Sequence, residues 1–141
     1  MLVRLMYASR ATETVRPEVL NAILKKSTHN NPAVGVTGVL CFSGEIFLQV
    51  LEGGRGQVSK LYNRIAQDPR HQDVVLLSYD EIDERSFAGW AMGQVNMSRL
   101  NPALLLKYSE AAVLDPYAVS GKVSMALFNE LVATASVMCL P

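Results

Sequence analysis

The sequence has few of the residues that mark disulfide-bonded, metal-binding or nucleic-acid-binding proteins. Cys41 and Cys139 are the only cysteines, too few for a disulfide framework, and they favour a reducing compartment such as the cytoplasm. The two histidines, His29 and His71, have no other ligand nearby at a metal-binding spacing, so we expect no metal site. Thirteen basic residues balance thirteen acidic ones, which leaves no net charge to attract nucleic acid or an anionic membrane.

Long apolar runs and common catalytic motifs are also missing. No stretch approaches the about 20 apolar residues of a membrane-spanning helix, and the start "MLVRLMYASR" is too short and too polar for a signal peptide. There is no G-x-S-x-G nucleophile motif. The stretch "GGRGQV" at residues 53–58 matches no phosphate-binding pattern, and a tight strand-to-helix turn explains its glycines. None of these patterns marks a catalytic or phosphate-binding site.

What the sequence does have is enough apolar material for one domain with a real core. The chain has 141 residues, of which 50% are hydrophobic, and its mean hydropathy is +0.17. Along the chain, apolar residues that alternate as in a strand are followed by apolar residues at helical spacing. Pro17 suits the first turn of a helix, Ser43-Gly44 is typical of a hairpin, and Asp68-Pro69 ends a helix. We predict strands over 1–9, 35–42, 45–52, 73–82 and 90–97, and helices over 16–27 and 57–67.

This order, β-α-β-β-α-β-β, predicts an α+β fold with a ferredoxin-like mixed sheet and two helices on one face. Two further helices are expected in the tail, over 103–112 and 117–138, because Asn101-Pro102 and Asp115-Pro116 each resemble an N-cap followed by proline. They would cover the other sheet face or form a dimer through Val119, Val123, Leu127 and Leu131. We divide the chain into a domain at 1–97 and a C-terminal helical extension at 98–141, within one structural unit.

Two polar side chains fall on the helix-covered face of the predicted sheet. Gln49 interrupts the apolar strand "EIFLQVLE", and Tyr7 lies on the first strand, which neighbours the third in this topology. A Tyr–Gln hydrogen bond inside an ordinary core would explain the pair. An amide has more hydrogen-bonding positions than one phenol can satisfy, however, and Asn31 follows the first helix at the level of the same face. Together these residues favour a slot for a planar ligand with donors and acceptors.

Four motifs occur in order along the chain: "YAS" from Tyr7, "NNPAVGVTGVL" from Asn30, "FLQVLEG" from Phe47 and "FAGWAM" from Phe87. In this order and at these separations the sequence resembles the BLUF domain, the blue-light sensor that uses FAD. The resemblance implies FAD as the cofactor, although no residue here excludes FMN or riboflavin. It also implies the short type of BLUF protein, which is not itself an enzyme and acts on a separate, unidentified effector protein.

The resemblance implies roles for individual residues. Tyr7 corresponds to the electron and proton donor, Gln49 to the glutamine between that tyrosine and the flavin, and Asn31 to the residue at the flavin pyrimidine edge. Trp90 and Met92, two residues apart and so expected on one face of the predicted last strand, correspond to a pair whose placement in the pocket differs between interpretations. Further residues expected to contact the flavin or its ribityl-phosphate arm are Ser9, Ile23, Asn30, Arg64, Ile65, Arg70 and His71.

The implied mechanism is that transfer from Tyr7 rearranges the Gln49 amide, by rotation or tautomerisation, and so shifts flavin absorption to the red. We expect the change to pass through the fifth strand to the tail helices, where it alters a surface that binds a partner protein or a second copy of the chain. We expect neither nucleic acid nor a membrane as a partner. One alternative is a non-photoactive ferredoxin-like regulatory domain that binds a small molecule. Another is a small hydrolase such as an acylphosphatase, for which Arg10 is present without a convincing phosphate loop.

Overall fold

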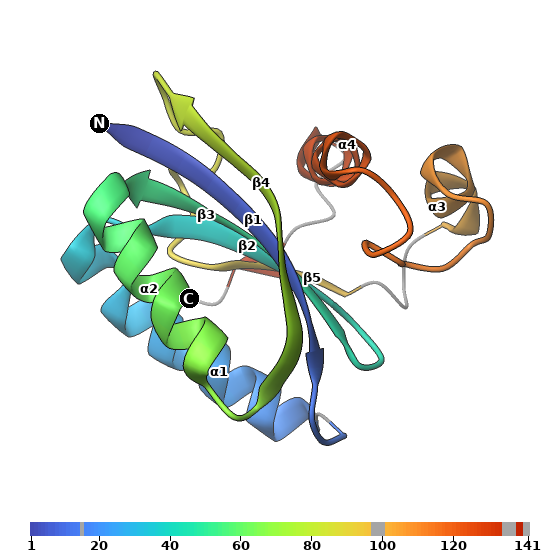
Figure 1. Cartoon of the computed structure of the whole chain (residues 1–141), viewed down its shortest axis with the longest axis horizontal. Helices are drawn as coiled ribbons and strands as arrows, with labels where there is room; N and C mark the ends of the chain where they lie inside the picture. The colour runs from blue at the N-terminus through green and yellow to red at the C-terminus, as the bar shows by residue number, and fades with distance from the viewer. Residues whose placement is uncertain (15, 97–100, 134–137, 140–141) are drawn as a thin grey trace.

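A six-stranded sheet carries helices on both faces (Figure 1). The computed structural model describes residues 1–14, 16–96, 101–133 and 138–139. The strand order is β4-β1-β3-β2-β5-β6, and neighbouring strands are antiparallel except for the parallel pair β2–β5. The first four strands have the ferredoxin-like order, which confirms the predicted fold; β6 was not predicted. The strands are β1 Leu2–Ala11, β2 Thr37–Ser43, β3 Ile46–Gly54, β4 His71–Ile82, β5 Gly93–Asn96 and β6 Met138–Cys139.

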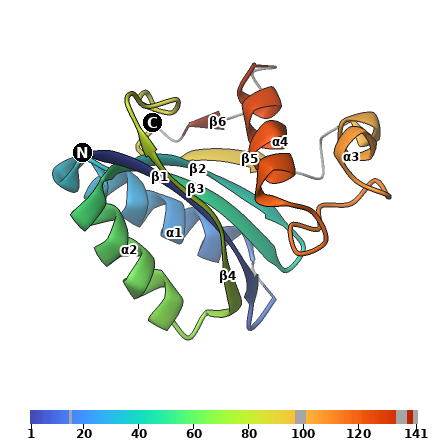
Figure 2. The ribbon, with the colours of Figure 1, turned by 45° about the horizontal axis from the view of Figure 1, so that its top comes forward.

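The helices form two layers, one on each side of the sheet (Figure 2). Helices α1 (Pro17–Asn30) and α2 (Arg55–Gln67) lie side by side on one face, and the short 3-10 turn η1 (Pro32–Val34) follows α1. On the other face lie α3 (Pro102–Tyr108) and α4 (Gly121–Ala133). The tail therefore covers the bare side of the sheet, as one of the two predicted arrangements had it. No helix among the described residues is long and apolar enough to cross a bilayer.

The sheet separates two hydrophobic cores, because successive side chains of a strand point to opposite faces. On β1, Val3, Leu5 and Tyr7 belong to the core under α1 and α2, and Met6 and Ala8 belong to the core under α3 and α4. The helices of the second layer contribute buried Leu105, Leu127, Phe128 and Leu131. Apolar residues on both faces of the central strands are thus accounted for by two separate helix layers.

The fifth strand is shorter than predicted, and this changes where two candidate residues lie. It begins at Gly93, and a turn in which the Trp90 amide donates to the Phe87 carbonyl oxygen (3.1 Å) precedes it. The turn breaks the period-2 alternation on which the prediction depended. Trp90 packs against the core under α3 and α4, whereas Met92 belongs to the core under α1 and α2. The expectation that the two share one face is therefore wrong.

The tail also begins its second helix later than predicted. Asn101 caps α3 as expected, since its Oδ1 accepts a hydrogen bond from the Ala103 amide (3.0 Å). Asp115 instead forms a turn with the Tyr117 amide (3.1 Å), and α4 starts after Ser120, whose Oγ accepts from the Val123 amide (3.2 Å). Of the predicted apolar stripe only Leu127 and Leu131 are buried, together with Ser124 and Phe128. Residues 134–137 of the predicted helix lie outside the described residues.

Gly38 permits β2 to approach β3 closely, and this gives a stability prediction. A Cβ atom added at Gly38 would lie 2.1 Å from the Val50 carbonyl oxygen, so the backbone would have to move. We expect Gly38→Ala to lower the free energy of unfolding by about 1–3 kcal/mol, as overpacking of a core typically does. Urea denaturation measures this. The matched control is Gly54→Ala, where an added Cβ meets no atom within 4 Å; equal losses in the two variants would contradict the prediction.

Candidate functional site

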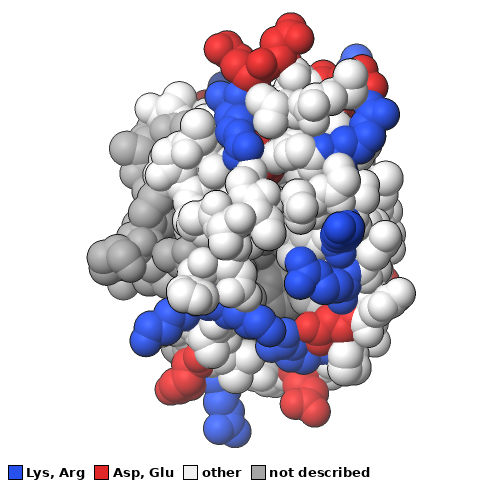
Figure 3. Space-filling view, turned by 90° about the vertical axis from the view of Figure 1, so that its left-hand side faces the viewer, with Lys and Arg blue, Asp and Glu red and all other residues white. Residues whose placement is uncertain are grey.

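A cavity of about 590 Å³ lies between α1, α2 and the sheet. Figure 3 looks at the left-hand side of Figure 1 and shows a band of Lys and Arg side chains across the lower half of this face, with further basic and acidic side chains towards its upper end. Of the residues predicted from the sequence, those that line the cavity are Tyr7, Ile23, Asn30, Asn31, Gln49, Arg64, Ile65, Arg70 and His71. Residues far apart in the chain are thus gathered around one hollow.

Several lining residues were not predicted, although helical spacing indicates them. On α1, Lys26 and Ser27 stand three and four residues after Ile23; on α2, Leu61 stands three residues before Arg64. Positions three and four apart share one face of a helix, so each predicted residue pointed to its neighbours. The lining residues not predicted are Ala22, Lys26, Ser27, His29, Ala33, Val34, Leu40, Phe47, Leu61 and Asp68.

Tyr7 and Gln49 lie directly opposite each other on the paired strands β1 and β3. The Tyr7 hydroxyl donates a hydrogen bond to Gln49 Oε1, and Gln49 Nε2 donates to the Sδ atom of Met92 (3.3 Å). Tyr7 is 2% exposed and Gln49 is 7% exposed. The Gln49 amide thus accepts a hydrogen bond from a phenol and donates one to a thioether. Its oxygen can accept one further hydrogen bond, and its nitrogen can donate one more.

The environment of Tyr7 keeps its hydroxyl protonated. Burial raises the pKa of Tyr7 well above its ordinary value, and the neighbouring Tyr62 and Asp68 groups raise it further. The Tyr62 ring meets the Tyr7 ring edge-on, with 5.7 Å between their centroids. The phenol is therefore a neutral hydrogen-bond donor over the whole physiological pH range.

Asn31 lines the cavity although it is only 4% exposed. Its Nδ2 donates to the Ala91 carbonyl oxygen (3.0 Å), which orients the amide. Among the residues that the structure describes, no donor reaches its Oδ1 atom. A buried acceptor left without a donor beside a cavity fits a ligand that brings an N–H group.

Three candidate residues do not line the cavity. Met92 lies beneath it and reaches it only through Gln49, and Trp90 lies on the other side of the sheet. Ser9 is fully buried, and its Oγ is hydrogen-bonded to His71 Nδ1 (2.8 Å). The pKa of His71 is lowered mainly by burial and further by Arg70, against the opposite effect of Asp68, so this ring is neutral at pH 7. Ser9 thus holds the ring of His71, which lines the cavity.

Three basic side chains line the cavity, and they differ in whether an acidic residue pairs with them. Arg70 forms an ion pair with Asp68 (2.6 Å), and hydrogen bonds from Arg70 are the largest cause that lowers the pKa of Asp68 to about 2. Lys26 and Arg64 have no acidic partner within the described part of the chain. These two side chains are therefore available for an anionic group of a ligand, such as a phosphate.

The sequence is similar to known proteins. A family model described as sensors of blue-light using FAD matches residues 2–93. The photoactivated adenylate cyclase subunit beta of Euglena longa is 38% identical over 92 residues, which are 64% of this chain and 11% of that protein. The blue light- and temperature-regulated antirepressor BluF of Escherichia coli strain K12 is 36% identical over 87 residues, 62% of this chain and 22% of that protein. The chain therefore spans only a small part of these curated relatives.

Solved structures match over nearly the whole chain. The photo-activated state of BlsA has a TM-score of 0.83 and 31% identity, covering 94% of this chain and 95% of that one. The dark state of BlrB, a BLUF protein, has a TM-score of 0.80 and 29% identity, covering 95% of this chain and 96% of that one. With the family model matching most of the sequence, the chain belongs to the BLUF family, the sensors of blue light that use FAD.

Proposed function

We propose that this BLUF chain holds FAD in the cavity between α1 and α2, and that Tyr7 and Gln49 carry out the photochemical switch. The observation that carries the proposal is the hydrogen-bonded series from the Tyr7 hydroxyl through the Gln49 amide to Met92, buried beneath a ligand-sized cavity. As a member of a sensor family, the chain is a photoreceptor rather than an enzyme.

The residues present fit a flavin. The isoalloxazine pyrimidine edge has an N–H between two carbonyl groups, and the unpaired Asn31 Oδ1 supplies the acceptor that this N–H requires. Lys26 and Arg64 at the mouth fit the phosphates of FAD or FMN, which riboflavin lacks. Gln49 keeps free donor and acceptor capacity toward the cavity. The site therefore supports a flavin that bears phosphate, with FAD as the family cofactor.

The mechanism that we infer uses two groups of the chain, the Tyr7 hydroxyl and the Gln49 amide. When bound in the cavity, a flavin would supply the blue-light absorption and an acceptor for one electron and one proton. Tyr7 lines the cavity, and its hydroxyl is neutral in the resting state. An oxidised phenol is a strong acid, so loss of an electron from Tyr7 would send its proton toward the acceptor Gln49 Oε1. When electron and proton return to Tyr7, rotation or tautomerisation leaves the amide with donor and acceptor exchanged. One net hydrogen bond is worth only about 0.5–1.5 kcal/mol, which suits a state that reverts in the dark.

Output is proposed to run from Met92 into β5 and from there to α3 and α4. The support is that Met92 accepts from Gln49 and is followed at once by β5, and that Val95 of β5 lies in the core under α3 and α4. Hydrogen exchange from Asn101 onward, compared in light and darkness, tests this route; identical protection would contradict it. The relatives named above are a cyclase subunit and an antirepressor, so the likeness indicates no single effector.

We further propose that the domain ends near residue 97, that 98–141 is its output extension, and that the chain works in the cytoplasm on a separate partner protein. A homodimer formed by the extension is the competing use of the same surface. Size-exclusion chromatography in light and darkness distinguishes the two, since only the dimer changes the elution volume without an added partner.

The decisive experiment is a difference spectrum of purified protein before and after blue illumination. We expect a yellow protein whose flavin absorption moves to the red and returns in darkness. A colourless protein that takes up neither FAD nor FMN would favour the alternative, a ferredoxin-like domain that binds another small molecule.

Asn31→Ala is expected to weaken flavin binding. The variant loses the acceptor for the flavin N–H, worth about 0.5–1.5 kcal/mol, and so raises the Kd for FAD by up to about tenfold. Titration of the flavin-free protein with FAD measures this. Asn63→Ala is the control, because Asn63 is exposed on α2 and is not among the residues that line the cavity, so its Kd for FAD should not change. An unchanged Kd in Asn31→Ala would remove this residue from the proposed site.

A further inference from the structure

The segment that connects β4 to β5, residues 83–92, is named here the crossing segment. It starts at one edge of the sheet and ends beyond β2, so it passes the ends of β1, β3 and β2 in turn. Its side chains enter both cores: Phe87 and Trp90 pack on the side of α3 and α4, and Met92 packs on the side of the cavity. The crossing segment is therefore in contact with the photochemical amide and with the opposite face of the sheet.

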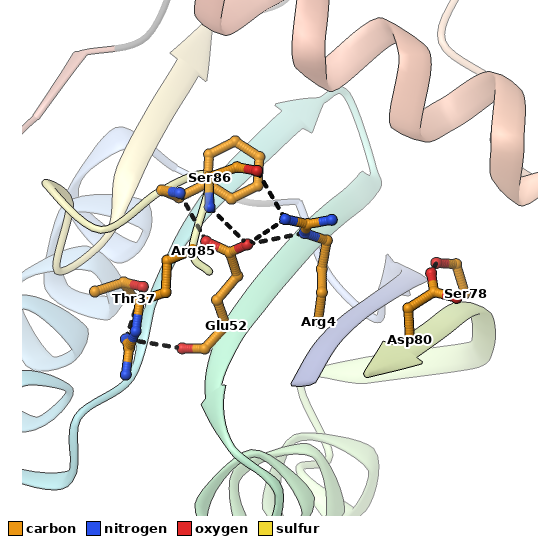
Figure 4. A network of polar contacts seen from close by, with 8 residues as sticks. Arg4, Thr37, Glu52, Ser78, Asp80, Arg85 and Ser86 are labelled. Carbon is orange, nitrogen blue, oxygen red and sulfur yellow. Dashed lines mark hydrogen bonds and ion pairs between the residues drawn. The ribbon is translucent and has the colours of Figure 1, made fainter. Parts of the chain in front are cut away.

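Glu52, at the end of β3, holds the first half of the crossing segment (Figure 4). Its carboxylate is 0% exposed and accepts from the backbone amides of Ser86 (3.0 Å) and Phe87 (2.7 Å). Arg4, its cross-strand neighbour on β1, donates to the same carboxylate through Nε (2.8 Å) and Nη2 (2.7 Å), and also to Ser86 Oγ (2.7 Å). A buried charge is stable only when paired and hydrogen-bonded, and this one is both.

Arg85 fixes the same part of the crossing segment to β2. Its Nη1 donates to Thr37 Oγ1 (3.0 Å) and to the Glu52 carbonyl oxygen (3.3 Å), and its Nη2 donates to the Gly35 carbonyl oxygen (2.7 Å). Thr37 and Glu52 are paired in the sheet. The start of the crossing segment is thus tied to three adjacent strands at one level.

The end of the crossing segment is held by the two amides of the flavin site. Asn31 Nδ2 donates to the Ala91 carbonyl oxygen (3.0 Å), and Gln49 Nε2 donates to Met92 Sδ (3.3 Å). One residue before Ala91, the Trp90 carbonyl oxygen accepts from the Gly38 amide (3.1 Å). Gln49 and Glu52 are both on β3, three residues apart and on opposite faces, so one strand holds both ends of the crossing segment.

We propose that Glu52, together with Arg4, is a positioning residue for the light-driven rearrangement of Gln49. It fixes the crossing segment so that Met92 Sδ stays in place as the acceptor for the amide and so that a change at Gln49 moves Trp90 with it. This inference rests on the proposed function. Glu52 does not line the cavity, and its role is therefore independent of flavin contact.

The test uses flavin-loaded Glu52→Gln, which keeps the shape of the side chain but replaces one acceptor oxygen with a donor. We expect an unchanged dark spectrum, a normal red shift, and dark recovery at least about threefold faster, because a looser Met92 lowers the barrier to return of the amide by about 0.7 kcal/mol. In darkness, hydrogen exchange at the Ser86 and Phe87 amides should be faster. Acrylamide should quench Trp90, the only tryptophan, more strongly.

Two further variants make the result specific. Glu81→Gln is the matched control, since Glu81 pairs with Arg55 at an exposed site. Its dark recovery, hydrogen exchange and quenching should equal those of the wild-type protein. Arg4→Lys keeps the charge but loses the two-point contact with Glu52. It should also make dark recovery faster, by a smaller factor than Glu52→Gln. If Glu52→Gln does not fold, the recovery rate of Arg4→Lys tests the proposal instead.

Faster exchange at Ser86 and Phe87 with unchanged recovery would make Glu52 a structural residue only and overturn the proposal. Recovery, exchange and quenching equal to those of Glu81→Gln would overturn it as well. If the unchanged protein shows no red shift, the proposed function fails; exchange and quenching in darkness then still show whether Glu52 anchors the crossing segment.

Discussion

Tyr7→Phe is expected to bind flavin and to lose the light-induced red shift completely. Phenylalanine fills the same space in a position that is 2% exposed, so the cavity and the strand pairing remain. The variant lacks the hydroxyl that donates to Gln49 Oε1, and with it the proton that must move for the amide to rearrange. Difference spectroscopy under continuous blue light measures the result.

Tyr62→Phe is the matched control for this prediction. Its ring lies 5.7 Å from the Tyr7 ring, and no hydrogen bond joins it to Gln49 among the described residues. We expect Tyr62→Phe to keep the red shift. A normal shift in Tyr7→Phe, or loss of the shift in Tyr62→Phe alone, would show that Tyr7 is not the donor.

Gln49→Leu is expected to remove the red shift as completely, for a different reason. Leucine occupies a similar volume but has neither donor nor acceptor, so no rearrangement can change the hydrogen bonds of the flavin. The substitution also leaves the buried Tyr7 hydroxyl without its acceptor, which costs about 1–3 kcal/mol of unfolding free energy. Difference spectroscopy and urea denaturation measure the two effects separately.

Gln72→Leu is the control for Gln49→Leu, since Gln72 is an exposed glutamine on β4. It should keep both the shift and the stability. A red shift of normal size in Gln49→Leu would exclude the amide from the mechanism, whatever happened to stability.

Local patterns predicted the parts of the fold that regular strands and helices determine. The alternation in β1 placed Tyr7 on the face that α1 and α2 cover, and the ferredoxin-like order made β1 and β3 neighbours. From these two statements it follows that Tyr7 and Gln49 meet. Period and topology therefore sufficed for the centre of the site.

Irregular segments and long-range partners were not predictable in this way. The turn at Phe87–Trp90 separates Trp90 from Met92, and no period extends through a turn. Glu52 looks in sequence like the polar end of an apolar strand. It is buried because Arg4 lies opposite it and because two amides of the crossing segment reach it, contacts between residues 34 to 48 positions apart. Ser9 likewise finds His71 only through the pairing of β1 with β4.

Strand β6 gives β5 its second neighbour through only two paired positions, Gly93 with Cys139 and Gln94 with Met138. So short a ladder opens far more readily than the long pairings of β1 with β3 and β4. Each opening leaves the outer edge of β5 unpaired, immediately after Met92. In the part of the chain that the structure describes, the outer edge of β5 therefore depends on two backbone pairs for its cover.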